Sequence, residues 1–288
     1  MGDENQGSWL QVRRGDAPLL LCMPHTGTDI PAALAPRFKS LWLARKDTDW
    51  WIDRLYDFAP RLGATLIRTR ISRTVIDPNR DPSGASLYPG QATTELCPTT
   101  TFDGEPLYSG AAPGREEIAA RRSAWFEPYH GAIAAELARL RALHPHVVLY
   151  DCHSIRSQIP RLFSGTLPHF NLGTHSGASC SPALAARIEA VCAATEFSRI
   201  TNGRFKGGYT TRHYGRPADG VHAVQMELAC RGYLREPLGS VETGAWPCPY
   251  DPEFAAPLRA ALERVLAACL AFAGDATGSR SESRRESG

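Results

Sequence analysis

Two histidines and an aspartate stand where a folded α/β protein would bring polar side chains together. His25 follows the apolar run Leu19–Met23, and His153 follows a second apolar run, residues 146–151. Both runs are typical of buried strands, and the carboxyl ends of neighbouring parallel strands meet at one edge of a sheet. Asp49 lies in the first turn of a predicted helix. Two neutral imidazoles with one carboxylate are the ligand set of a catalytic zinc ion, which keeps its fourth position for water.

Two further aspartates lie near these residues in the sequence and have structural explanations. Asp151 precedes His153 by two positions, so in an extended strand both side chains point to the same side. We expect Asp151 to accept a hydrogen bond from the imidazole and so fix its tautomer. Asp47 is a good N-cap residue, and we expect it to cap the helix.

A glutamate lies near the end of a third predicted strand, Val221–Leu228. Alternation along this strand places Gln225 and Glu227 on one face. A buried carboxylate is costly unless it is paired or used in catalysis. Beside a zinc-bound water, Glu227 would be the natural general base, taking a proton from the water and passing it to the leaving nitrogen. A salt bridge with a residue such as Arg231 is the structural alternative.

Two segments, 72–81 and 207–215, combine arginine with asparagine, hydroxyl groups or glycine. Main-chain amides left accessible by glycine, hydroxyl donors and a guanidinium are what the carboxylates of a small substrate need. We therefore expect a binding site for one or two carboxylates. The candidate residues are Asn79 and Arg80 in the first segment, and Thr210, Thr211 and Arg212 in the second.

Strands and helices alternate along the chain, which favours a layered α/β fold around a parallel or mixed sheet. Residues 78–114 are rich in Pro, Gly, Thr and Asp, so we expect a long functional loop, whose aromatic residues favour order. The other expected strands are Ala64–Arg68 and Thr74–Asp77, and the expected helices are Asp49–Pro60, Glu116–Leu143, Pro182–Ala194 and Pro252–Phe272.

No internal repeat or linker divides the chain, so residues 9–273 are predicted to form a single domain. Residues 274–288 consist mainly of serine, arginine and glutamate with almost nothing apolar. Such a composition cannot bury enough apolar surface to fold, and we expect a disordered tail.

The composition argues against several classes of protein. The formal net charge of +2 gives no electrostatic reason to expect nucleic acid as the partner. No apolar run reaches the length of a membrane span, and the polar N-terminus does not resemble a secretory signal. The eight cysteines include no C-x-x-C pair, and several lie in apolar runs as core residues would. We therefore expect a cytoplasmic protein that acts on a small molecule.

Taken together, the motifs resemble those of the N-formylglutamate deformylases, the amidohydrolases of bacterial histidine breakdown. The resemblance covers about residues 18–234, and the long loop after residue 83 is its most specific part. The motifs that carry it are Pro24-His25-x-Gly27, Asp47-Thr48-Asp49-Trp50, Ser72-Arg73-x-Val75-Ile76-Asp77-x-Asn79-Arg80-Asp81-Pro82, Gly84-Ala85-Ser86-Leu87-Tyr88-Pro89-Gly90-Gln91-Ala92-Thr93-Thr94, Asp151-Cys152-His153-Ser154, Asn171-Leu172-Gly173-Thr174, Gly207-Gly208-Tyr209-Thr210-Thr211-Arg212 and Gln225-Met226-Glu227-Leu228.

This resemblance implies a fold similar to the zinc carboxypeptidases and aspartoacylase: a three-layer α/β/α arrangement around a mixed, largely parallel sheet. It implies a metal centre at the carboxyl edge of that sheet. The implied roles are His25, Asp49 and His153 as zinc ligands, Asn79 and Arg80 for a substrate carboxylate, Arg73 for the oxyanion and Glu227 as the base.

One departure from the carboxypeptidase pattern leaves the metal carboxylate open. Those enzymes take it from three residues after the first histidine, where this chain has Thr28. Asp49 is therefore assigned by residue type, and Asp47 and Asp29 remain alternatives.

The implied activity is metal-dependent hydrolysis of N-formyl-L-glutamate to formate and L-glutamate, the last step of a histidine degradation route. Selectivity for this dicarboxylate would come from Arg80, Arg212 and the hydroxyls of Thr210 and Thr211. Cobalt, manganese or iron would fit the same ligands as zinc. A related hydrolase of another N-acyl amino acid, such as formyl- or acetyl-aspartate, is the first alternative, and a non-enzymatic binder of an acidic metabolite is the second.

Overall fold

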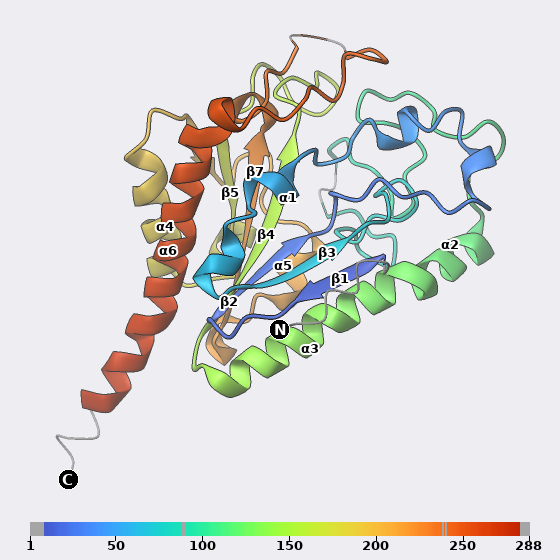
Figure 1. Cartoon of the computed structure of the whole chain (residues 1–288). Helices are drawn as coiled ribbons and strands as arrows, with labels where there is room; N and C mark the ends of the chain where they lie inside the picture. Colours follow the sequence, from blue (N-terminus) through green and yellow to red (C-terminus); the bar gives the residue numbers. More distant parts are fainter. Residues whose placement is uncertain (1–8, 88–89, 238, 240, 283–288) are drawn as a thin grey trace.

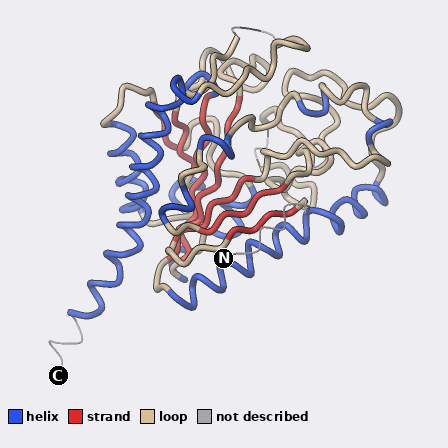
Figure 2. The backbone as a smooth tube through the Cα atoms, viewed as in Figure 1, coloured by secondary structure: helices blue, strands red, loops and turns tan. Residues whose placement is uncertain are grey.

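A mixed sheet of seven strands separates two helical layers in the computed structural model, which describes residues 9–87, 90–237, 239 and 241–282 (Figures 1 and 2). This is the three-layer α/β/α architecture predicted from the sequence. The strands are β1 Leu10–Arg13, β2 Leu19–Met23, β3 Thr65–Thr69, β4 Val147–Ile155, β5 Phe170–Gly173, β6 Arg199–Thr201 and β7 Val221–Ala229. The helices are α1 Ile52–Leu55, α2 Arg115–Arg121, α3 Glu127–Leu143, α4 Pro182–Ala193, α5 Tyr209–Tyr214 and α6 Pro252–Glu282.

The strand order is β1-β3-β2-β4-β7-β5-β6, and the four strands β3, β2, β4 and β7 in its middle are parallel. Only β1 against β3 and β5 against β7 are antiparallel. The carboxyl ends of β2, β4 and β7 therefore meet at one edge. The register pairs Cys22 with Asp151, and His153 with Glu227.

The two faces of the sheet carry different side chains along β4 and β7. One face is mostly apolar and packs against α1, α4 and α6, with Tyr150 and Met226 among its residues. The opposite face packs Leu149 and Ala223 against α3. On that second face the later positions of the same two strands are polar: Asp151, His153, Gln225 and Glu227. The alternation predicted for β7 is confirmed, and one face changes from core to polar site along the strands.

Two of the long helices form where the sequence predicts them. Ser181 accepts a hydrogen bond from the Ala183 N–H as the N-cap of α4, and Pro182 occupies the first helical turn. Helices α2 and α3 are joined by a π-helical segment, Arg122–Phe126, so the predicted helix 116–143 is continuous but irregular in its first half.

Two predicted elements are wrong or much shorter than expected. Thr74–Asp77 is not a strand, because the hydroxyls of Ser72 and Thr74 both donate to the Ala44 carbonyl and hold the segment in a turn. The predicted helix Asp49–Pro60 is reduced to the single turn α1 and a 3₁₀ turn, Ala59–Leu62. Asp49 is thereby left in a loop.

The described part of the long loop after β3, residues 78–87 and 90–114, packs several of its apolar side chains into small clusters. Leu96 and Cys97 pack against Val75 and Phe126, and Tyr108 pairs with Phe38. All eight cysteines are buried and free, which confirms them as core residues. Among the described residues, no helix is both long and apolar enough to cross a membrane.

The region predicted to be a disordered tail begins as helix, because α6 continues to Glu282. Residues 283–288 lie outside the described part of the chain.

Leu149 tests the importance of the sheet core beneath the polar positions. This residue of β4 is fully buried and packs against α3. Leu149→Ala is expected to lower the free energy of unfolding by about 2–5 kcal/mol, because a cavity replaces packed side-chain atoms. Chemical denaturation measures this value. Leu143→Ala, at a leucine that is 55% exposed, is the matched control and should change it by less than about 0.5 kcal/mol.

Candidate metal and active site

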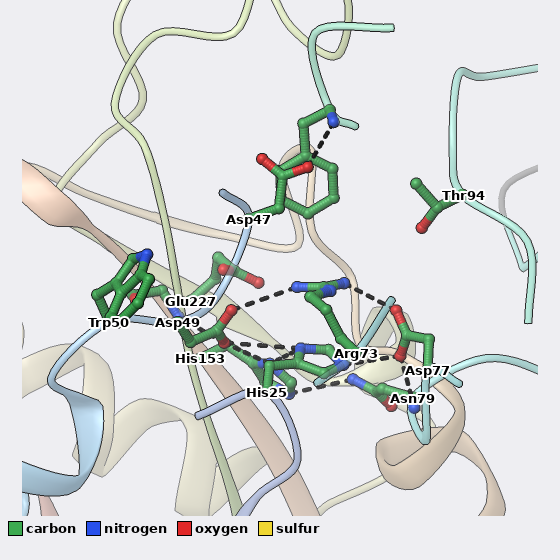
Figure 3. Close-up of polar contacts among 12 residues, drawn as sticks. His25, Asp47, Asp49, Trp50, Arg73, Asp77, Asn79, Thr94, His153 and Glu227 are labelled. Carbon is green, nitrogen blue, oxygen red and sulfur yellow. Dashed lines mark hydrogen bonds and ion pairs between the residues drawn. The ribbon is translucent and has the colours of Figure 1, made fainter. Parts of the chain in front are cut away.

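His25, Asp49 and His153 converge at the carboxyl edge of the sheet (Figure 3). His25 lies two residues beyond β2, and His153 lies within β4, the neighbouring parallel strand. Asp49 reaches them from the loop before α1, where its N–H donates to the His25 carbonyl at 3.0 Å. Each of the three residues is 2% exposed or less. The structure thus brings together the three residues that the sequence singled out.

The three potential ligand atoms form a small triangle. The Nδ1 atoms of His25 and His153 are 3.1 Å apart, and Oδ2 of Asp49 lies 3.2 Å from Nδ1 of His153 and 3.6 Å from Nδ1 of His25. Tetrahedral coordination with bonds of about 2.0 Å separates neighbouring ligand atoms by about 3.3 Å. The observed spacing therefore fits one small cation bound by all three atoms.

A carboxylate holds the far nitrogen of each imidazole. Nε2 of His25 is 2.7 Å from Asp77, and Nε2 of His153 is 2.9 Å from Asp151. In the neutral tautomer that these carboxylates favour, Nε2 carries the proton and Nδ1 presents its lone pair. Two lone pairs that face each other need a cation or a proton between them. The predicted role of Asp151 is confirmed in geometry, whereas the equivalent role of Asp77 was missed.

Arg73 links the two aspartates on the His25 side. Its guanidinium donates to Oδ1 of Asp49 at 3.2 Å and to Oδ2 of Asp77 at 2.8 Å, and it lies over the ring of Phe102 at 4.8 Å. Arg73 therefore orients one potential metal ligand and the carboxylate behind another.

At two residues of the triangle, neighbouring charges together shift the pKa more than burial does. Burial raises the pKa of Asp49, but His25, His153 and Arg73 outweigh it and hold the pKa below its usual value. Burial lowers the pKa of His153, but Asp151 and Asp49 outweigh it and hold the pKa well above its usual value.

Four buried carboxyl groups lie around the triangle together with two guanidiniums, and such a concentration of carboxyl groups favours a bound cation. The carboxylates are Asp49, Asp77, Asp151 and Glu227, and the guanidiniums are Arg73 and Arg80.

Asn79 and Arg80 lie beside the triangle, and their side chains already have partners. The Asn79 amide group donates to Asp151 at 3.2 Å and lies 3.1 Å from Nε2 of His153. Its Oδ1 accepts from the Thr210 N–H at 2.9 Å. Arg80 donates to the carbonyl and hydroxyl oxygens of Thr94, each at 3.0 Å, and lies 3.6 Å from Asp77.

Glu227 lies next to His153 in the sheet register and accepts from the Gln225 amide at 3.1 Å. The pKa of Glu227 is raised to about 7, mainly by burial. The charges of His153 and Arg73 oppose this rise, and the charge of Asp49 adds to it. A carboxyl group with that pKa can take up and release protons near neutral pH. No salt bridge joins Glu227 to Arg231 among the described residues, since Arg231 donates instead to the Leu167 carbonyl.

A cavity that is open to solvent lies over these residues. His25, His153, Glu227 and Gln225 form part of its lining, as do Arg73, Asn79 and Arg80. Residues from other segments also line it, among them Thr93, Thr94, Phe102, Leu162, Arg204 and Phe205. The sequence analysis missed Arg204, because nothing in the sequence placed residue 204 near the strand ends.

Three predicted substrate-binding residues do not line this cavity. Thr210 and Thr211 are fully buried in α5, and Arg212 donates to the Gly207 carbonyl at 2.9 Å. Of this segment, Gly208 lines the cavity. Residue 208 must be glycine, because the Asn79 side chain occupies the space that a Cβ would need.

The other two aspartates proposed as metal ligands lie elsewhere. Asp29 is partly exposed and pairs with Arg70 at 3.0 Å. Asp47 caps no helix, in contrast to the prediction, because α1 starts only at residue 52. Its Oδ2 accepts from the Phe102 N–H at 2.6 Å, and Oδ1 lies 3.6 Å from Arg156.

Comparison with known proteins bears on this geometry. The model of the N-formylglutamate amidohydrolase family matches residues 17–234. The chain belongs to this family. An N-formylglutamate deformylase from Pseudomonas aeruginosa is 49% identical over 265 residues, which cover 91% of this chain and 96% of the relative. A protein of the same name from Pseudomonas putida is 46% identical over 268 residues, which cover 92% of this chain and 97% of the relative.

Two solved structures share the fold. The N-formylglutamate amidohydrolase of Ralstonia eutropha JMP134 superposes with a TM-score of 0.75 at 22% identity, over 93% of this chain and 99% of that one. A protein from Agrobacterium tumefaciens gives a TM-score of 0.69 at 18% identity, over 94% and 98% of the two chains. At these identities the likeness concerns the fold.

The pairing of Asp77 with His25 generates a test of the metal site. Asp77→Asn is expected to weaken the affinity for zinc about 10- to 100-fold, because the amide no longer favours the tautomer that presents Nδ1. Competition with a chromophoric chelator measures the affinity. Glu136→Gln is the matched control, at a buried carboxylate of α3 that pairs with Arg14 and Arg139, and should leave the affinity unchanged. Equal affinities in both variants would contradict the assignment.

Proposed function

We propose that this chain is a metal-dependent deformylase that hydrolyses the formamide bond of N-formyl-L-glutamate, yielding formate and L-glutamate. The observation that carries the proposal is the triangle of His25, Asp49 and His153, which lies at a cavity that Glu227 also lines. The names of the two Pseudomonas relatives support the substrate.

The residues of the triangle suit zinc, although cobalt, manganese or iron would accept the same donors. A bound zinc ion would act as a Lewis acid toward the formyl oxygen and lower the pKa of a water molecule. His25, Asp49 and His153 would hold it, and Asp77 and Asp151 would keep both imidazoles oriented.

Glu227 acts as general base and then as general acid. Its carboxylate takes a proton from the attacking water and delivers it to the nitrogen of the departing glutamate. Its raised pKa, about 7, suits both transfers at neutral pH. The Gln225 amide, which donates to Oε2, keeps the carboxylate in place.

Arg73 and Arg80 supply the positive charge on the substrate side. Arg73 lines the cavity beside Asp49, so its remaining N–H groups are placed to stabilise the oxyanion that forms at the formyl carbon. Arg80 binds the α-carboxylate, with its guanidinium held in position by Thr94 and by the Asn79 carbonyl. Asn79 contacts Arg80 through its main-chain carbonyl, and its side-chain amide contacts both Asp151 and His153.

Formate release by the purified protein tests the activity and the metal requirement together. Dialysis against a chelator is expected to abolish turnover of N-formyl-L-glutamate, and stoichiometric zinc to restore it, because the triangle alone cannot activate water. Formyl- and acetyl-aspartate serve as competing substrates. Preference for either would support the related hydrolase, and absence of turnover on all three, with metal bound, would favour a binding protein.

Glu227→Gln tests the proton transfer. The variant is expected to lower kcat at least about 100-fold, with zinc content and substrate KM nearly unchanged, because the amide cannot accept the proton. Steady-state kinetics of formate release give both constants. Glu236→Gln is the control: Glu236 accepts hydrogen bonds from Ser157 and does not line the cavity. Near-normal kcat in Glu227→Gln would remove Glu227 from the mechanism.

A further inference from the structure

Glutamate has two carboxylates, and the site described so far accounts for one of them. Arg80 is proposed for the α-carboxylate, and Arg73 is already paired with Asp49 and Asp77. The residue predicted for the second carboxylate, Arg212, does not line the cavity. A different cation must therefore select glutamate over a neutral amino acid of the same shape.

Arg204 is the remaining arginine in the cavity lining. It lies in the segment between β6 and α5, on the part of the wall that also includes Leu162 and Phe205. Its guanidinium donates to two carbonyl oxygens, those of Leu162 at 2.9 Å and Ala92 at 2.7 Å. These two carbonyls fix the direction of the guanidinium, and the Arg204 side chain lines the cavity in which a substrate carboxylate would lie.

Arg204 and Arg80 hold the same short segment of the long loop. Arg80 donates to the Thr94 carbonyl, and Arg204 donates to the Ala92 carbonyl, two residues earlier. Two residues of extended chain span at most about 7 Å. The carboxyl carbons of glutamate are separated by four C–C bonds, or about 5 Å. The two guanidiniums are thus attached to carbonyl groups that lie at most about 7 Å apart, a distance that does not exceed the reach of such a substrate by much.

The side chains near Arg204 suit the rest of the glutamate side chain. Leu162 and Phe205 are apolar and line the cavity, and the Arg204 guanidinium lies 5.3 Å from the Phe205 ring centre. Such a wall can cover two methylene groups while the guanidinium binds the carboxylate beyond them. Arg–carboxylate pairs are often bidentate, which adds geometric selectivity to the charge.

We propose that Arg204, and not Arg212, binds the side-chain carboxylate of the substrate and sets the preference for N-formylglutamate over uncharged N-formyl amino acids. This inference rests on the proposed deformylase activity. It assigns the two arginines different tasks: Arg80 recognises the carboxylate that every amino acid has, and Arg204 recognises the one that distinguishes glutamate.

N-formylglutamate and N-formylglutamine form the test pair, because they have nearly the same shape and differ in one charge. Arg204→Met should lower kcat/KM for N-formylglutamate about 100-fold while changing that for N-formylglutamine less than about threefold. The preference for glutamate should therefore collapse. Arg80→Met should lower kcat/KM for both substrates by similar factors and keep their ratio.

Two further variants separate a local effect from a general one. Arg204→Lys retains the charge and should restore part of the preference. Arg199→Met, at an exposed arginine of β6, should leave both substrates unaffected. A retained preference in Arg204→Met, or a preference lost in Arg212→Met instead, would overturn the assignment. Turnover of N-formylglutamine by Arg204→Met shows directly that the variant is folded.

The inference and the proposed function fail in different ways. If the native protein hydrolysed neither formyl substrate, the proposed function would be wrong. Binding of glutarate, which has the two carboxylates without the amide, then tests Arg204 by calorimetry. Arg204→Met should weaken glutarate binding at least tenfold and leave butyrate binding unchanged. Equal glutarate affinity in the native and variant proteins would overturn the inference.

Discussion

The site depends on two imidazole nitrogens that are held face to face. Asp77 and Asp151 bind the outer nitrogens of His25 and His153, and the inner nitrogens lie 3.1 Å apart. In the neutral tautomers two lone pairs would face each other and repel, unless a proton or a cation lies between them. A divalent cation would turn this repulsion into coordination, and the buried carboxylates around the imidazoles would favour it.

The parallel sheet makes this arrangement possible. Strands β2, β4 and β7 are neighbours with a fixed register, so residues from three distant parts of the chain reach one edge without a long loop. Along β4 and β7, one face begins with apolar residues that pack on α3 and continues with polar residues, among them the cross-strand pair His153 and Glu227. The packed core lies directly beside the site on the same two strands. The rigid sheet therefore holds the His153 imidazole and the Glu227 carboxylate in fixed positions relative to each other.

The sequence predicted the parts of the site that lie at strand ends, because strand periodicity determines which side chains share a face. His25, His153, Asp151 and Glu227 all belong to this class. Asp77 and Arg204 do not. Asp77 reaches His25 because hydroxyls of Ser72 and Thr74 bind a carbonyl about 30 residues earlier, which turns a strand-like sequence into a turn. Arg204 reaches the cavity through a contact with Ala92, 112 residues away, and no local pattern encodes such a contact.

The segment that carries Asp49 also carries Asp47, which accepts a hydrogen bond from the main chain of Phe102. Phe102 in turn lies against the guanidinium of Arg73, which binds Asp49. These contacts form a closed ring that runs from the metal ligand through the cavity wall and back. A displacement of the candidate ligand Asp49 would therefore be passed through Arg73 to Phe102, in the wall of the substrate cavity.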